Sequence, residues 1–166
     1  MDEAAIALDP TLRKCWMKRG RQKRFPAAAG TPPVHHIFGG LNWRDGTISW
    51  QLAKRRNSAS FIHWLEHLMR HCYPREQVIL IMDNAGFHNS AATRAAISLY
   101  ESRLLVIYLP PYAPNLNPIE RYWRHLKDQV CAHKLYPSMD DLRDAIVKEL
   151  TRQNDLSNCY RYQQEC

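Results

Sequence analysis

The chain has 166 residues and a hydrophobic fraction of 45%, which is enough for one globular domain and too high for a disordered protein. Its formal net charge of +7 favours a polyanionic partner, with nucleic acid ahead of membrane. The five cysteines are odd in number and form no C-x-x-C pair, which argues against a disulfide scaffold and a zinc ribbon. The first residues are too acidic for a signal peptide, and no apolar run approaches membrane-spanning length. We therefore expect a cytoplasmic protein without membrane contacts.

The first half of the chain predicts a hairpin followed by a helix. Residues 34–53 contain two β-rich runs around a central Asp-Gly pair, which is a strong hairpin signal. Over residues 58–72 apolar side chains recur at helical spacing, and Ser58 or Ser60 could cap that helix.

The second half alternates apolar strands with helices. Strands are predicted at residues 78–82 and 103–109, with an Ala-rich helix over residues 90–101 between them. A helix starting near Asn117, its predicted N-cap, follows a proline-rich loop, and a last helix covers residues 138–150.

This order of elements implies an α/β fold with a mixed sheet. Its parallel part should be buried on both faces, because the two strands alternate with helices and read as continuous apolar runs. We expect one domain over residues 1–153 and a C-terminal tail over residues 154–166.

Two acidic residues occupy positions where a sheet of this kind forms its sites. Asp83 directly follows an apolar strand, and Glu120 opens the helix after the next strand, so both can reach the same edge. Paired carboxylates there suit Mg²⁺, which prefers oxygen ligands. Each residue also has a simpler interpretation, since Asp83 could begin a turn and Glu120 could form a capping box with Asn117.

The sequence motifs around these acids resemble those of a known family. DNAGFH, followed by LPPYAPNLNPIERYWRHLK, is similar to the DDE endonuclease core of mariner-like and related bacterial insertion-sequence transposases. The resemblance implies a ribonuclease-H-like fold with flanking helices. It also implies that a first acid lies in a D-E word, which here is Asp2 with Glu3 beside it. Asp2, Asp83 and Glu120 would then bind two Mg²⁺ or Mn²⁺ ions.

The D-E word lies at an unusual place in this chain. In the family the first acid ends the central strand of the sheet, whereas here only Met1 precedes Asp2. We therefore expect a core truncated at its N-terminus, with the first central strand largely missing and marginal stability when it is expressed alone. Self-association, or an upstream transposase polypeptide that supplies the strand, are the protein partners that we consider.

Several other residues are candidates for the site or for DNA contacts. Asn84 and His88 follow Asp83 closely and could line the site, although His88 could equally pack at a helix start. His63, His67 and His71 fit a zinc-peptidase pattern but are interpreted as a solvated helix face. Basic residues that could contact DNA phosphates are Arg13, Lys14, Lys18, Arg19, Arg21, Lys23, Arg24, Lys54, Arg55, Arg56, Arg121 and Arg124.

The resemblance implies a transposase catalytic domain that cleaves and transfers DNA strands with divalent metal ions. Such a protein would act on DNA in the bacterial cytoplasm and associate with the nucleoid while bound. The alternative is an inactive DNA-binding remnant that keeps the basic surface without an assembled metal site.

Overall fold

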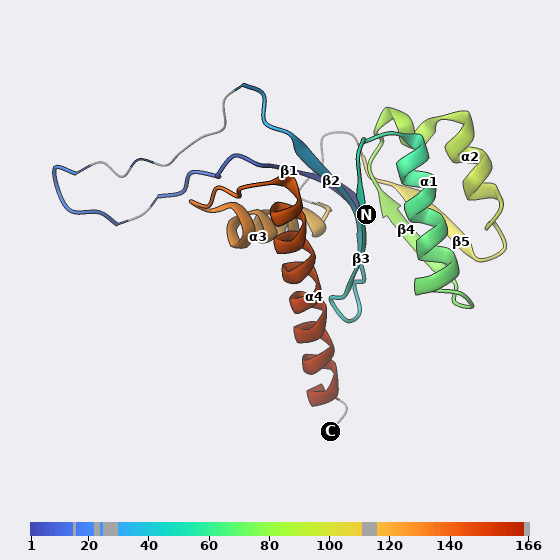
Figure 1. The fold of residues 1–166 in the computed structure, drawn as a ribbon. Coiled ribbons are helices and arrows are strands. Elements are labelled where there is room, and N and C mark those ends of the chain that lie inside the picture. The colour runs from blue at the N-terminus through green and yellow to red at the C-terminus, as the bar shows by residue number, and fades with distance from the viewer. Residues whose placement is uncertain (15, 22–23, 25–29, 111–115, 165–166) are drawn as a thin grey trace.

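The computed structural model describes residues 1–14, 16–21, 24, 30–110 and 116–164, with the helical backbone alone over residues 156–164 (Figure 1). In chain order the elements are β1 (Asp2–Ala7), β2 (Val34–Leu41), β3 (Ile48–Ala53), α1 (Ser58–His67), the π-helical turn η1 (Leu68–Cys72), β4 (Val78–Met82), the 3₁₀ turn η2 (Gly86–Asn89), α2 (Ala91–Ser98), β5 (Leu104–Tyr108), α3 (Ile119–Cys131) and α4 (Met139–Gln164). None of the helices in these ranges combines the length and the apolar character that crossing a membrane requires.

Three antiparallel strands, β1, β2 and β3, form the centre of the molecule. The predicted hairpin joins β2 and β3, and its turn contains Gly46 at a φ of 71°, a conformation that favours glycine. Asp45 fixes the same turn, because its Oδ1 accepts a hydrogen bond of 2.9 Å from the Thr47 N–H. The Asp-Gly signal therefore predicted this hairpin correctly.

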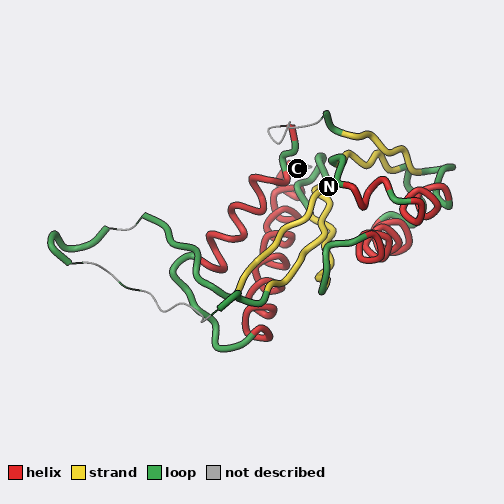
Figure 2. Tube along the Cα trace, turned by 90° about the horizontal axis from the view of Figure 1, so that it is seen from above, coloured by secondary structure: helices red, strands yellow, loops and turns green. Residues whose placement is uncertain are grey.

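The other two strands, β4 and β5, pair in parallel, as predicted, with Val78 opposite Leu104. Helix α1 covers one face of this pair, where Leu80 and Met82 are buried. Side chains on the other face are between 44% and 64% exposed; they are Ile79, Ile81, Leu105 and Ile107. The prediction of burial on both faces is wrong, because within the described residues α1 and α2 lie on the same side of the two strands (Figure 2).

The first strand differs from the expectation that it is largely missing. Six residues form β1, which starts at Asp2 and pairs with β2 along its whole length. It continues past Asp2 because Ala4 and Ile6 are buried against α3 and α4. A hydrogen bond of 2.7 Å from the Met1 N-terminus to the Ile81 carbonyl links this strand to β4. The mixed α/β architecture is thus confirmed, but as a three-stranded and a two-stranded part.

Helices pack on both sides of the three-stranded sheet and create two cores (Figure 2). Ile37 and Phe38 are neighbours on β2 and both are fully buried, but they point to opposite faces. Ile37 belongs to the core with α3 and α4, and Phe38 belongs to the core with α1 and β4. The sheet therefore fixes the position of α3 relative to β4.

Side chains define where three of the helices start. Asn57, and neither Ser58 nor Ser60, caps α1, since its Oδ1 accepts a hydrogen bond from the Ser60 N–H. Ser90 caps α2 in the same way, and Ser138 caps α4. Polar side chains one residue before each helix thus satisfy free N–H groups of the first turn.

Helix α4 extends beyond residue 153, where the sequence predicted a tail to begin. Its backbone is helical through Gln164. Asn154 holds it to the sheet, because its Oδ1 accepts from the Ile48 N–H at 2.8 Å and its Nδ2 donates to the Ile48 carbonyl at 3.0 Å. The first residue of the predicted tail is therefore a contact to the edge of β3.

Replacing Asn154 by Ala should lower the free energy of unfolding by about 1–3 kcal/mol, because two backbone groups of Ile48 lose their partner. Chemical denaturation followed by circular dichroism measures this change. Asp155→Ala is the matched control, since Asp155 is exposed on the same helix. Equal losses in the two variants would contradict a specific role for Asn154.

Gly39 allows α3 to approach β2 closely. A Cβ atom at this position would lie 2.6 and 2.8 Å from two ring atoms of Trp123, distances that real Cβ atoms do not show. Because Trp123 is buried on the helix that carries Glu120, we expect Gly39→Ala to displace α3 and to cost about 1–3 kcal/mol of stability. Denaturant unfolding measures the loss. Gly86→Ala, at which nothing lies within 4 Å of the added atom, should be nearly neutral; a neutral Gly39→Ala would show that Trp123 can move aside.

Candidate active site

Asp2 lies at the beginning of β1, opposite Gly39, and is 9% exposed. Desolvation by burial raises the pKa of its carboxyl group to about 7. The negative charges of Glu120, Glu3 and Asp83 raise this pKa as well, while a hydrogen bond to the Glu3 backbone opposes the shift. Asp2 was expected at the end of a strand; it instead starts one and faces the α3 side, together with Ala4 and Ile6.

Asp83 directly follows β4, as predicted, and its side chain is 49% exposed. Its Oδ1 accepts a hydrogen bond of 3.0 Å from the Ala85 N–H, so the residue does begin a turn. The same oxygen lies 3.0 Å from Nδ1 of His88. The turn and a role in a site are therefore compatible, because the turn fixes the direction of a carboxylate that remains half-exposed.

Glu120 is exposed in the first turn of α3. Helix α3 begins without a side-chain cap, so the prediction of Asn117 as N-cap is wrong. The Asn117 side chain is buried and its Nδ2 donates a hydrogen bond of 3.2 Å to the Met1 carbonyl. Asn117 therefore ties the start of α3 to the start of β1, which brings Glu120 towards Asp2.

The three predicted acids thus approach one another where the start of β1 meets α3 and the loop after β4. The effect of Asp83 and Glu120 on the pKa of Asp2 shows that they are close enough to interact. The Met1 ammonium group is a second indicator: burial lowers its pKa, and Asp2, Glu3 and Asp83 act against that shift. Among the described residues, however, no three His, Cys, Asp or Glu side chains approach closely enough to form a metal centre. The acids converge without forming a preassembled three-ligand cluster.

His88 is fully buried beside this convergence, between the rings of Phe61 and Phe87 at centroid distances of 4.8 and 4.3 Å. Its Nε2 lies 3.0 Å from Oε1 of Glu3, and its Nδ1 lies 3.0 Å from Oδ1 of Asp83. Burial lowers the pKa of the imidazole, but the hydrogen bond and charge of Glu3, together with Asp83, outweigh it, and the net shift is upward. His88 therefore both packs at a helical turn and contacts a predicted site residue.

Glu3 was not selected as a site residue from the sequence. Its side chain is 3% exposed and reaches His88 on the face of β1 opposite to that of Asp2. The available signal was the D-E word itself, because adjacent residues of a strand point to opposite faces. Two neighbouring carboxylates in a strand must therefore meet different partners.

Asn84 connects the segments that follow β4 and β5. Its Nδ2 donates a hydrogen bond of 2.6 Å to the Leu109 carbonyl. Residues 111–115, which follow this contact and belong to the proline-rich word, lie outside the described residues. Asn84 thus anchors the start of that word to the loop that carries Asp83.

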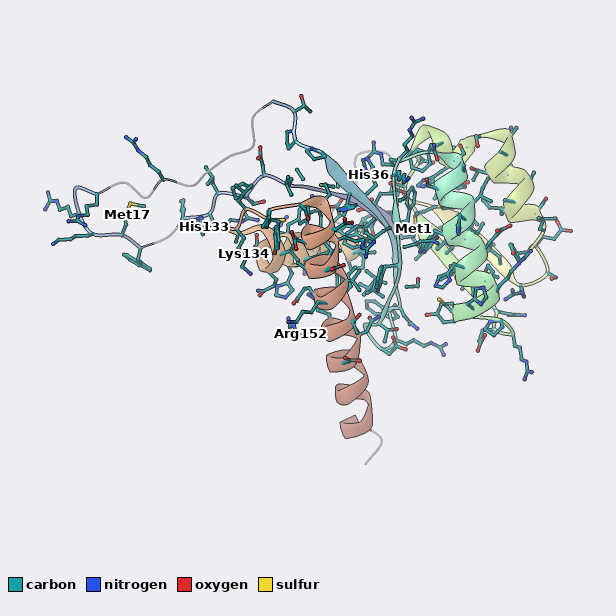
Figure 3. All side chains as sticks on the ribbon, viewed as in Figure 1. Met1, Met17, His36, His133, Lys134 and Arg152 are labelled. Carbon is teal, nitrogen blue, oxygen red and sulfur yellow. The ribbon has the colours of Figure 1, made fainter. Side chains whose placement is uncertain are left out.

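The structure separates the predicted basic residues into two groups. One group is on the long segment between β1 and β2, which extends away from Met1 and carries Met17 near its tip (Figure 3). Arg13 begins it and forms an ion pair with Asp128 near the end of α3. Asp128 lies eight residues after Glu120 on α3, so the ion pair of Arg13 is about 12 Å along the helix from Glu120. Exposed side chains follow it at Lys14, Lys18, Arg19, Arg21 and Arg24, whereas Lys23 lies outside the described residues.

The second basic group lies nearer to the acids. Arg121 and Arg124 are exposed on the first turns of α3, beside Glu120. Lys54, Arg55 and Arg56 are exposed in the connection from β3 to α1. Helix α1 begins at Ser58, which donates a hydrogen bond to the carbonyl of Phe87, the neighbour of His88. Arg121 and Arg124 therefore lie beside Glu120, and the segment 54–56 is connected through Ser58 to the turn that carries His88.

The zinc-peptidase pattern does not form a site among the described residues. His63 and His71 are exposed on the α1–η1 segment, and the rings of His67 and His71 lie 5.4 Å apart. These histidines do not form a three-ligand cluster with any described residue. The interpretation as a solvated helix face is consistent with this arrangement.

Comparison with known proteins agrees with this geometry. Residues 1–143 match the family described as DDE superfamily endonuclease. The chain is 31% identical over 138 residues to the insertion element IS630 uncharacterized 39 kDa protein of Shigella sonnei, covering 83% of this chain and 40% of that protein. Its structure is similar to that of the Mos1 transposase paired-end complex with left transposon end, with a TM-score of 0.68, 19% identity, and coverage of 90% of this chain and 46% of the other. It is also similar to the Mos1 mariner paired-end complex with Mn, with a TM-score of 0.66, 19% identity, and coverage of 94% and 48%.

The chain therefore spans less than half of the length of these relatives. At 19% identity the structural similarity shows the fold, and the predicted ribonuclease-H-like architecture is confirmed. The family match includes the positions of Asp2, Asp83 and Glu120. With the match covering most of its length, the chain belongs to the DDE superfamily of endonucleases.

Proposed function

We propose that this chain is the catalytic core of a transposase that cleaves DNA and joins DNA strands. The observation that carries the proposal is the convergence of Asp83 and Glu120 on Asp2: the three acids come from separate elements, and the charges of the other two raise the pKa of Asp2. Membership of the endonuclease family, the insertion-element relative and the similarity to a transposase bound to a transposon end support it.

The donor chemistry of the site suits Mg²⁺ or Mn²⁺. All three predicted ligands are carboxylates, the oxygen donors that these hard cations prefer. When bound, two such ions would activate the attacking oxygen of water or of a DNA 3′-hydroxyl and stabilise the leaving oxygen of a phosphodiester. The similarity to a Mos1 complex with Mn is consistent with this choice.

The protein side chains prepare the site electrostatically. Three neighbouring acids raise the pKa of Asp2, which shows that they create a negative potential at its carboxylate. A cation placed there would lower that pKa again, because an opposite charge favours the ionised form. Asp83 contributes a carboxylate that the Ala85 N–H already orients.

The two basic groups would bind DNA phosphates at different distances from the chemistry. Arg121 and Arg124 would flank the strand at the carboxylates, because they share the first turns of α3 with Glu120. The segment 54–56 would contact DNA beside the turn that carries His88. The basic residues of the segment between β1 and β2 would contact DNA farther from the carboxylates, beginning with Arg13 about 12 Å along α3 from Glu120. Such contacts position DNA and carry no sequence information.

A DNA-binding remnant is the second candidate function. The specific observation in its favour is that no three ligands form a metal centre among the described residues. In this case the basic groups would still bind DNA, but the acids would bind no metal. Metal binding therefore separates the two functions.

Thermal unfolding with and without millimolar Mn²⁺ tests metal binding. We expect Mn²⁺ to stabilise the chain by on the order of 1 kcal/mol or more once its concentration is several times Kd. Asp83→Asn should lose this stabilisation and also any Mn²⁺-dependent nicking of supercoiled DNA, while salt-dependent DNA binding remains. Glu101→Gln is the control, because Glu101 is an exposed acid in the turn after α2. No response to Mn²⁺, with equal DNA binding by the parent chain and Asp83→Asn, would identify the remnant.

The affinity for Mn²⁺ should depend on pH through Asp2. A metal ion must displace the proton of a carboxyl group whose pKa is about 7, so the affinity should fall by about tenfold per pH unit below that value. In the folded chain the pKa of Asp2 is raised from the usual 3.8 to about 7. Its contribution to the free energy of unfolding is therefore fully present below pH 3.8 and is lost as the pH rises through about 7. Titrations between about pH 5 and pH 8 measure the affinity, and Asp2→Asn should flatten the profile. A flat profile in the parent chain would exclude Asp2 as a ligand.

A further inference from the structure

The structure assigns to Glu3 and His88 the role of positioning residues that orient the Asp83 carboxylate through a chain of contacts from β1 to the loop after β4. This inference rests on the proposed metal-binding role of Asp83. It gives the two acids of the D-E word separate tasks, since Asp2 would bind metal and Glu3 would hold the residue that orients a second ligand.

The first step of the argument is the set of atoms around the His88 ring. Nε2 faces Oε1 of Glu3 at 3.0 Å. Nδ1 faces Oδ1 of Asp83 at 3.0 Å and the Asp83 carbonyl oxygen at 3.2 Å. The ring thus contacts Glu3 through one nitrogen and the backbone and side chain of Asp83 through the other, and so joins the two acids.

The second step is the rigidity of the ring. His88 has no exposed surface, and Phe61 and Phe87 hold it from two sides. Its partner Glu3 is 3% exposed and belongs to a strand that is paired with β2 along its whole length. The ring that contacts Asp83 belongs to η2, and Glu3 attaches it to the sheet.

The third step is the effect on Asp83. The Ala85 N–H donates to Oδ1 of Asp83, and Nδ1 of His88 lies 3.0 Å from the same oxygen while it is hydrogen-bonded to the Asp83 carbonyl oxygen. Fixing one oxygen sets the direction of the other, while the side chain remains 49% exposed. Partners that orient metal ligands in this way typically change metal affinity by about 10–100-fold when they are removed.

Two substitutions of His88 separate positioning from simple packing. The amide of Asn can reproduce the Nδ1 donor, and the amide of Gln can reproduce the Nε2 donor, so His88→Asn keeps the contact to Asp83 and His88→Gln keeps the contact to Glu3. Both remove the buried ring and should lower stability to a similar extent. We expect His88→Gln to weaken Mn²⁺ binding by about 10–100-fold and His88→Asn to remain within about threefold of the parent chain.

A readout without metal distinguishes failure of this inference from failure of the proposed function. Hydrogen exchange of the Ala85 amide reports whether Asp83 accepts its N–H, and the Leu109 amide, which bonds to the Met82 carbonyl, serves as internal reference. Protection of Ala85 relative to Leu109 should fall in His88→Gln and persist in His88→Asn. The same pattern without any Mn²⁺ binding would overturn the proposed function and leave the positioning role standing.

Glu3 provides an independent test of the same chain of contacts. Glu3→Ala should weaken Mn²⁺ binding and reduce the protection of the Ala85 amide. Glu3 contacts His88, which in turn contacts Asp83, so this effect would be indirect. In the His88→Gln background the same substitution should add no further loss, because the contact that it supports is already absent. Equal metal affinity and equal Ala85 protection in the two His88 variants, or additive losses in the double variant, would overturn the inference.

Discussion

The alternation of side chains along β1 is the constraint on which the arrangement of the site depends. Because successive residues of a strand point to opposite faces, Asp2 turns towards α3 and Glu3 towards the loop after β4. On the α3 side, the charge of Glu120 raises the pKa of Asp2. On the other side, Glu3 contacts His88, which contacts Asp83. A single dipeptide therefore connects the two halves of the molecule, and a shift of β1 by one residue relative to β2 would exchange the two roles.

Crowding of like charges is the second feature of the site. Burial and three neighbouring acids favour the protonated form of Asp2, whereas the half-exposed Asp83 keeps access to solvent. Such an arrangement disfavours closer approach of the carboxylates, which agrees with their convergence without a three-ligand cluster among the described residues. The same negative potential would attract a divalent cation. Repulsion between the carboxylates therefore opposes their close approach without metal, and the same charges would favour binding of the proposed Mg²⁺ or Mn²⁺ ions.

Packing at a distance from the acids determines whether they meet. The indole of Trp123 lies against the bare backbone of Gly39, the residue that pairs with Asp2, so α3 approaches the sheet closely at this point. Asn117 adds a hydrogen bond from the start of α3 to Met1. The Met1 N-terminus donates a hydrogen bond from the start of β1 to β4. His88 adds a second link, because it contacts Glu3 of β1 and Asp83, which follows β4. The position of each acid thus depends on contacts between elements that are distant in sequence.

The sequence by itself determined the order and type of the elements, the hairpin, the parallel pairing of β4 and β5, and the three acids as candidates. These features depend on periodicity, turn chemistry and short words, all of which are contained within a few neighbouring residues. Tertiary structure alone decided that one face of β4 and β5 is open, that Asn117 bonds to Met1, and that Glu3 is a partner of His88. The reason is the separation along the chain: Glu3 and His88 are 85 residues apart and Met1 and Asn117 are 116 apart. No local pattern specifies such pairs, because they form only when the packing of both cores brings their elements together.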